Sequence, residues 1–174
     1  YVKLGVEFND QTELALTALT FAQRFYHNWR DQHWHPTGLL QLAHSSQEAD
    51  RQRRFLQRND YPRSIFYPVT REQASALTGV PTESGGLWFP GSGWLEPANL
   101  CKELANHPLI STVFHSEVNN LRRLDGTWSI STVNNRSITA DRVVICSGHL
   151  SPELIPTKGR FRLKAIRGQV SYLP

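Results

Sequence analysis

Three short stretches of this sequence combine residue types that can bind or orient a planar molecule. The first, residues 85–97 (GGLWFPGSGWLEP), places glycine turns on both sides of an aromatic segment that includes Trp88 and Trp94. Glycine lets the backbone approach a ligand or another strand closely, and indole rings provide flat apolar walls. The pattern fits two interpretations: a corner of the core, or the side of a pocket for a planar ligand.

The second stretch is a continuous apolar run over 143–146 that ends abruptly at Ser147, Gly148 and His149. A run without alternation predicts a strand buried on both faces of a sheet. In open α/β sheets, ligands lie just beyond the carboxyl ends of such strands. The serine, glycine and histidine are therefore candidate ligand-binding residues.

The third stretch is Arg167-Gly168-Gln169, inside a predicted alternating strand over 160–173. Glycine within a strand indicates close approach of a ligand or of backbone. The Arg167 guanidinium can form paired, planar hydrogen bonds with a carboxylate or with a cofactor anion. A structural salt bridge explains the arginine equally well, and the residue types do not separate the two roles.

No complete catalytic or phosphate-binding motif is visible. Gly91-x-Gly93 follows a strand and precedes a helix, but Glu96 stands where a dinucleotide fingerprint needs its third glycine, so we reject that motif. P-loop and nucleophile-elbow patterns do not occur. His33-x-His35 could ligate a metal, but no second cluster of ligands follows, so no metal site is expected.

The elements that would position these stretches predict a mixed α/β structure of the α+β class. Helices are indicated by apolar spacing of three and four, by capping residues and by terminal glycine. In chain order, we expect a helix over 11–30 capped by Asp10 and Glu13, a strand over 38–43, a helix from Ser45 to Arg58, a strand over 65–69, a helix from Thr70 and Gln73 to Gly79, and a helix opened by Pro97 with Leu100, Cys101, Leu104 and Ala105 as its apolar stripe.

Three closely spaced strands then predict a β-meander over 111–138. The expected strands cover 111–118, 127–133 and 136–138. Asp125-Gly126 is a strong hairpin signal between the first two, and a pair of asparagines follows the second.

Composition limits the class of protein without choosing a function. The chain has 174 residues, 39% hydrophobic residues and a net charge of +4, with a sequence pI near 9.3. These values permit an RNA partner without requiring one. Cations gather at 51–58 and at 158–164. The second group is explained either by a solvated edge strand, whose charges prevent edge pairing, or by contact with phosphates.

Composition also bears on where the protein is located and on whether the sequence is a fragment. No apolar run is long enough for a membrane span. Cys101 and Cys146 lie far apart in apolar surroundings, and we expect reduced core thiols of a cytoplasmic protein. The absence of methionine indicates an internal fragment of a longer reading frame.

Taken in order, several motifs resemble the D-amino-acid-oxidase-type flavoproteins, and among them most closely a member that modifies tRNA. The motifs are FAQRFYHNW at 21–29, GLLQLA at 38–43, GGLWFPGSGWLEPANLC at 85–101, VVICSGH at 143–149 and IRGQVSYLP at 166–174. The resemblance covers essentially the whole chain but only the middle of the family's domain. The Gly-rich loop for the ADP moiety, the closing strands and a methyltransferase half are not among these residues.

The resemblance implies a division into three parts. Residues 1–96 would be the first part of a substrate-binding domain, and 97–159 would supply the helix, meander and last strand of an FAD-binding domain. Residues 160–174 would return to the substrate domain.

The implied activity is oxidation of a secondary amine. FAD would take a hydride from the N–CH₂ group of a carboxymethylaminomethyl arm on the wobble uridine of tRNA. Hydrolysis of the imine would release glyoxylate and leave aminomethyl-uridine. The expected partners are tRNA and a methyltransferase domain of the same polypeptide, with no DNA and no membrane. Because the flavin carries the chemistry, no catalytic residue is assigned.

The resemblance also implies roles for individual residues. In the complete domain, the FAD-contacting residues would be Val118, Ser147, Gly148, His149 and Gly168, and the substrate-side residues would be Arg167, Trp88 and Trp94. Two other functions stay open. One is oxidation of a free small amine such as glycine or sarcosine, and the other is an inactive fragment that only binds RNA or a partner.

Overall fold

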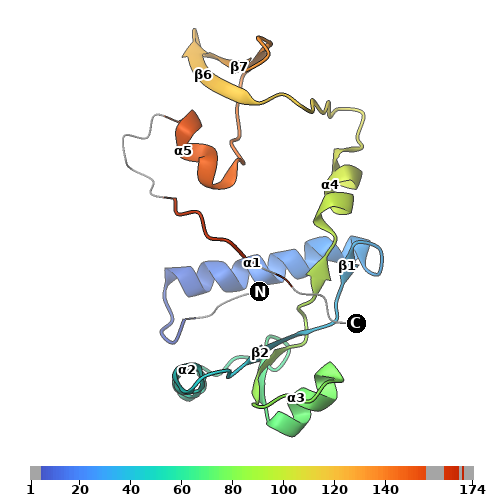
Figure 1. Ribbon diagram of the computed structural model, residues 1–174, viewed down its shortest axis with the longest axis vertical. Helices are drawn as coiled ribbons and strands as arrows, with labels where there is room; N and C mark the ends of the chain where they lie inside the picture. Colours follow the sequence, from blue (N-terminus) through green and yellow to red (C-terminus); the bar gives the residue numbers. More distant parts are fainter. Residues whose placement is uncertain (1–4, 156–162, 169, 171–174) are drawn as a thin grey trace. The chain divides into compact units, whose positions relative to one another are not determined.

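The computed structural model describes residues 5–155, 163–168 and 170, and it combines helices with antiparallel strands (Figure 1). The predicted mixed α/β class is confirmed. The chain divides into two compact units, unit 1 (Tyr1–Ile110) and unit 2 (Ser111–Pro174). None of the helices in the described ranges has the length and apolar character needed to cross a membrane. Whether substrate and FAD domains divide at residues 96 and 159 stays a prediction.

Unit 1 contains most of the helices and two small sheets. In chain order its elements are α1 (Asp10–Tyr26), a 3₁₀ turn (His27–Trp29), β1 (Trp34–His35), β2 (Leu39–Leu42), α2 (Ser46–Arg58), β3 (Tyr67–Val69), α3 (Arg71–Thr78), β4 (Gly86–Phe89), β5 (Trp94–Leu95) and α4 (Pro97–Ala105).

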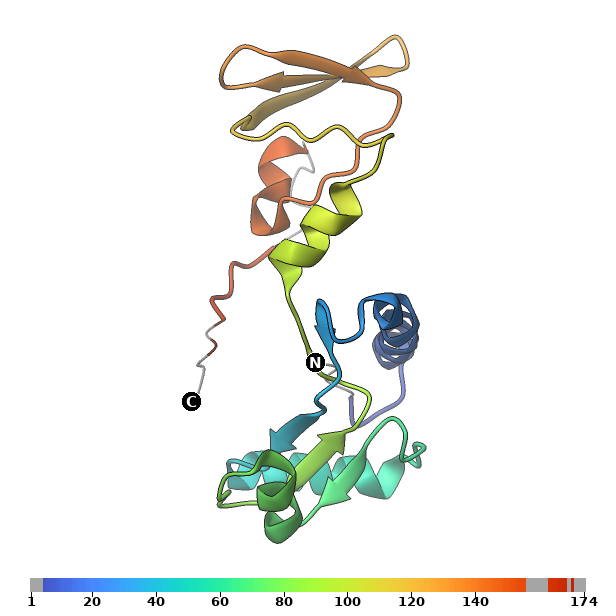
Figure 2. The ribbon, with the colours of Figure 1, turned by 90° about the vertical axis from the view of Figure 1, so that its right-hand side faces the viewer.

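A three-stranded antiparallel sheet in the order β2-β4-β3 forms the centre of unit 1. Helices α2 and α3 both lie against this sheet (Figure 2). Its core consists of Phe55 from α2, Phe66, and Leu87 and Phe89 from β4, all at most 3% exposed. Gly86 has no room for a side chain, because a Cβ there would meet the Gln41 carbonyl of β2. The glycine therefore permits β4 to pair closely on both sides.

The helix ends follow the capping chemistry that the sequence predicts, with one correction. Ser45 caps α2 by accepting a hydrogen bond from the Glu48 amide, and Thr70 forms a full capping box at α3. Gly79 ends α3 in the left-handed conformation at φ 73°. The predicted cap of α1 is wrong by one residue: Asn9, not Asp10, accepts from the backbone, and Asp10 is already helical.

Unit 2 contains the predicted meander, with different strand limits. Its strands are β6 (Val118–Leu124), β7 (Thr127–Thr132) and β8 (Ser137–Ala140), paired antiparallel in sequence order. Asp125 and Gly126 both have positive φ, as a tight hairpin turn requires. The first strand therefore ends at this turn, whereas the prediction placed it over 111–118. A 3₁₀ turn (Gly148–Leu150) and α5 (Ser151–Leu154) follow.

The predicted buried strand over 143–146 is wrong. These residues are irregular, and Val144 is 85% exposed. A strand buried on both faces needs a paired strand on each side and a covering layer above and below. In the described part of unit 2, the three strands pair only with one another, so the apolar run has no ladder partner there.

Two further predictions are wrong: the strand over 160–173, in its described part, and the burial of the two cysteines. Residues 163–168 and 170 are exposed and form no strand, and the rest of the strand predicted over 160–173 lies outside the described residues. The cysteines are free thiols, but both are exposed rather than in the core. On α4 the neighbouring Leu100 occupies the buried position, leaving Cys101 on the open side and Leu104 42% exposed.

Candidate functional site

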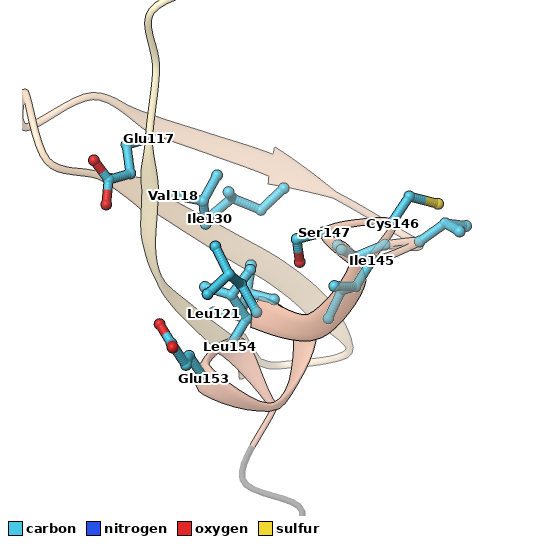
Figure 3. A pocket seen from close by; sticks show the side chains of 12 residues that line it. Glu117, Val118, Leu121, Ile130, Ile145, Cys146, Ser147, Glu153 and Leu154 are labelled. Atoms are coloured by element: carbon cyan, nitrogen blue, oxygen red, sulfur yellow. The ribbon is translucent and has the colours of Figure 1, made fainter. Parts of the chain in front are cut away.

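Unit 2 contains an apolar pocket of about 450 Å³ (Figure 3). One wall is a single face of the meander. Leu121 of β6 and Ile130 of β7 are directly paired, so alternation along the strands directs both to the same face, where Val118 joins them in the lining. Figure 3 shows these three side chains directed toward a common space.

The opposite face of the same strands is mostly polar. The next paired positions, Arg122 and Ser129, belong to that face. An antiparallel sheet with one apolar and one polar face normally buries the apolar one. Here that face borders the pocket, so the alternation of the sequence positions the pocket wall.

The second wall comes from the chain after the meander. Residues 143–147 pass along the pocket, and Leu150 and Leu154 close it from the 3₁₀ turn and α5. Gly148 has φ 58°, a left-handed conformation at the point where the irregular segment 143–147 enters the 3₁₀ turn. The Ser147 and Ser151 hydroxyls lie 3.3 Å apart across this bend.

Two carboxylates give the pocket its only formal charges among the described lining residues. Glu117 and Glu153 lie on one side of it, whereas the Cys146 thiol points away on the other side (Figure 3). No lysine, arginine or histidine belongs to the described lining. The pocket therefore suits an apolar, flat group and disfavours an anion.

The pocket includes only part of the predicted cofactor-binding set. Val118 and Ser147 line it, whereas Gly148 and His149 follow directly in the chain and are exposed. Gly168 and Arg167 lie in the exposed segment 163–168. The sequence analysis missed Leu121, Ile130, Leu150 and Leu154. For the two strand residues, their alternation with polar neighbours was an available signal.

The aromatic segment 85–97 of unit 1 is partly a corner of the core and partly an exposed aromatic surface. Leu87 and Phe89 belong to the core, and the ring of Trp88 covers Gly38, where a Cβ would clash with the indole. Trp94, in contrast, is 50% exposed and stacks on His35 with ring centroids 3.9 Å apart. The segment is therefore a core corner at β4 and a surface aromatic site at β5.

A polar network joins β1 and the preceding turn to α4. Glu103 accepts a hydrogen bond from the Trp29 indole at 2.7 Å and lies 2.8 Å from His33 Nε2. Glu96 contacts His35 Nε2 at 3.2 Å and accepts a hydrogen bond from Asn99. The hydrogen bond from Asn99, followed by that from His35, lowers the pKa of Glu96. Within the described residues, no cluster of side chains has the arrangement of a metal site.

A smaller pocket of about 250 Å³ lies between α1 and the turn at Gly91–Gly93. Tyr26 and Trp34 contribute aromatic rings to it, and the Gln23 amide donates a hydrogen bond to the Gly91 carbonyl. The glycines that resemble a dinucleotide fingerprint thus pack against a helix side chain. A Cβ at Gly91 would clash with the Gln23 side chain, so close packing explains the glycine at this position.

Comparison with protein families decides the relationship. The model of the family described as FAD dependent oxidoreductase matches residues 6–174. The chain belongs to this family. The resemblance drawn from the sequence motifs is confirmed for nearly the entire chain.

Relatives within this FAD-dependent family are similar over the full chain. The chain is 54% identical to the tRNA 5-methylaminomethyl-2-thiouridine biosynthesis bifunctional protein MnmC of Marinobacter nauticus, covering 100% of this chain and 28% of that protein. It is 36% identical to the protein of the same name from Hahella chejuensis, covering 99% and 29% respectively. The chain thus spans less than a third of the length of these relatives.

Solved structures support the fold. Glycine oxidase from Geobacillus kaustophilus matches with a TM-score of 0.66 at 21% identity, over 84% of this chain and 42% of that chain. L-proline dehydrogenase from P. horikoshii matches with a TM-score of 0.63 at 14% identity, over 92% and 45%. At these identities the matches establish a common fold.

The pocket of unit 2 fits one part of FAD and not another. Its apolar walls and its volume suit a flat ring system. A pyrophosphate needs backbone N–H groups at a helix N-terminus or a cation, and it is repelled by carboxylates. Glu117 and Glu153 supply only negative charge. The described lining residues therefore suit a ring of the cofactor and offer no group that would bind its phosphates.

Proposed function

We propose that this chain is part of an FAD-dependent oxidoreductase that removes the carboxymethyl group from carboxymethylaminomethyl-uridine at the wobble position of tRNA. The products would be aminomethyl-uridine and glyoxylate. The observation that carries the proposal is the 54% identity, across the entire chain, to a relative named for tRNA 5-methylaminomethyl-2-thiouridine biosynthesis. Membership of the FAD dependent oxidoreductase family supports the reaction type.

When bound, FAD would supply the two-electron oxidation of the N–CH₂ carbon. Val118, with Leu121 and Ile130 beside it, would hold a ring of the cofactor by apolar contact. Ser147, Gly148, His149 and Gly168 would contribute polar and backbone contacts. The apolar lining would also keep water from the bound ring, which strengthens nearby polar interactions.

Because the described lining of the pocket offers the phosphates no partner, this 174-residue chain should bind FAD weakly, whereas the intact protein should retain it. Gel filtration with absorbance of the flavin and of the protein measures the ratio. Stoichiometric flavin on the 174-residue chain would contradict this part of the proposal.

In the intact protein, Arg167, Trp88 and Trp94 would each contact the substrate. The Arg167 guanidinium would pair with the carboxylate of the carboxymethyl arm, which distinguishes this substrate from a neutral amine. Arg167 is exposed in segment 163–168, so its charged group is free to meet a ligand carboxylate. Trp88 and Trp94 would provide aromatic surface for the modified base.

The proposal includes a partner and a location. The Marinobacter nauticus relative is named a bifunctional protein, and we propose that a methyltransferase domain accompanies this domain in one polypeptide. The net charge of +4 suits contact with tRNA. A tRNA-modifying enzyme of this kind would act in the cytoplasm.

Glyoxylate release tests the function directly. The intact protein is incubated with tRNA carrying carboxymethylaminomethyl-uridine, and in parallel with free glycine and sarcosine. We expect glyoxylate from the tRNA and at most a trace from the free amines. Release from the free amines alone would show a small-amine oxidase, and release from none would refute the oxidation.

A further inference from the structure

One face of the Trp94 indole stacks on another ring. Trp94 in β5 pairs directly with His35 in β1, and their rings stack with an interplanar angle of 16°. Despite this contact, half of Trp94 stays exposed. Tryptophan is enriched among the residues that dominate binding energy, because a rigid ring offers a large contact area. A half-exposed indole that stacks on His35 is therefore a candidate contact surface.

The ring beneath Trp94 is held in place from α4. His35 Nε2 lies 3.2 Å from Glu96 Oε1, and Asn99 donates a hydrogen bond of 2.7 Å to Glu96 Oε2. The Glu96 amide also donates to the His33 carbonyl, which ties the start of α4 to β1. The stacked pair thus has a fixed orientation before any ligand arrives, and less conformational entropy is lost on binding.

We propose that the other face of the Trp94 indole stacks an unpaired nucleobase of the RNA substrate. The inference rests on the proposed function, because that function supplies RNA as the substrate. Proteins that read single-stranded RNA stack unpaired bases on aromatic side chains, and a base in an unpaired loop is free to adopt this position. Every base has a flat face, so the contact requires no sequence-specific hydrogen bond.

The charges around the stacked pair favour a base over a phosphate. Glu96 and Glu103 both lie in the network that anchors β1 to α4, and their carboxylates already accept hydrogen bonds from side chains. A phosphate placed against these groups would be repelled, whereas a neutral base would not. Attraction of the RNA backbone would come from the positive charge of the whole chain, which is +4.

The test measures the affinity of the 174-residue chain for two RNA probes. One is a short hairpin with an unpaired loop, and the other is a blunt duplex with the sequence of its stem. We expect Trp94→Ala to weaken hairpin binding about tenfold, equivalent to ~1.4 kcal/mol, with duplex binding unchanged. Trp94→Phe should keep most of the affinity for the hairpin, because an aromatic ring remains. His35→Ala should weaken hairpin binding less than Trp94→Ala, because the indole stays but loses the ring that it stacks on. Phe114→Ala removes an aromatic ring that is 76% exposed, and it should change neither affinity.

Salt dependence adds a second readout. Stacking releases no counterions, so the slope of log Kd against log salt concentration should be the same for the Trp94→Ala variant and the unaltered chain. Circular dichroism confirms that the variant is folded. The proposal is overturned by an unaltered chain that does not bind the hairpin, by unchanged affinity of the alanine variant, or by equal losses on hairpin and duplex. Normal glyoxylate release combined with any of these results would leave the proposed oxidation standing.

Discussion

The two units bury their apolar side chains to very different degrees. In unit 1, Phe55 and Leu87 are at most 2% exposed and belong to one hydrophobic core cluster. Among the described residues of unit 2, no hydrophobic side chain is fully buried, and Val144 and Phe114 are largely exposed. Unit 1 therefore has a buried hydrophobic core, whereas the apolar face of the meander in unit 2 borders a pocket.

This difference follows from the elements that each unit brings to its sheet. In unit 1, α2 and α3 lie against a sheet whose central strand pairs on both sides. Among the described residues of unit 2, the apolar face of the meander meets the irregular segment 143–147, the 3₁₀ turn and the short α5. Stability should therefore depend on apolar residues of unit 1, and ligand binding on apolar residues of unit 2.

The largest expected effect is on the core of unit 1. Phe55→Ala leaves a cavity among Phe66, Leu87 and Phe89, and it should lower the free energy of unfolding by about 3–5 kcal/mol. The same substitution at exposed Phe114 should cost within about 0.5 kcal/mol. Urea unfolding followed by circular dichroism measures both. Equal losses would break the contrast between the units.

The next effect in size is expected at Arg167, and it concerns turnover rather than stability. Because this side chain is exposed, Arg167→Ala should leave unfolding unchanged. If its guanidinium pairs with the substrate carboxylate, turnover of modified tRNA by the intact protein should fall at least about tenfold, or ~1.4 kcal/mol. Glyoxylate release and flavin content are measured together. Loss of flavin would assign the arginine to the cofactor, and unchanged turnover would place the carboxylate partner elsewhere.

The smallest effect concerns acid stability of the network around Glu96. Its pKa is lowered in the fold by hydrogen bonds from Asn99 and His35, so the carboxylate stabilises the folded state when ionised. This contribution is complete above the usual glutamate pKa of about 4.3 and is lost as the pH falls through the lower folded value. Glu96→Gln should remove that pH dependence. If the free energy of unfolding falls equally in the two proteins between about pH 6 and about 3, the ionised Glu96 does not stabilise the fold.

The sequence predicted the elements that depend on local signals. Capping by Ser45 and Thr70, the left-handed Gly79 and the Asp125-Gly126 turn all have causes within a few neighbouring residues. Leu39–Leu42 and the helix that begins at Pro97 followed from apolar spacing and punctuation in the same way.

The errors arose where an element depends on distant partners. The apolar run over 143–146 has the composition of a buried strand, but composition does not provide the neighbouring strands that such a strand needs. Two lining residues of the pocket, Val118 and Ser147, coincide with FAD contacts that the family resemblance implies, and that role stays a prediction. The strand part of the pocket's remaining wall follows from the register that pairs Leu121 with Ile130, and the predicted turn at Asp125-Gly126 implies this register.

The central claim is that the pocket of unit 2 holds a ring of FAD, and a matched pair of variants in β7 tests it most directly. Ile130 lines the pocket, while its neighbour Ser129 belongs to the opposite face of the strand. In the intact protein, Ile130→Asp should lower the bound flavin at least tenfold, because it introduces a charge beside the ring. Ser129→Asp should leave the flavin content unchanged, with both variants retaining the circular dichroism spectrum of the unaltered protein. Equal flavin contents in the two folded variants would contradict the claim.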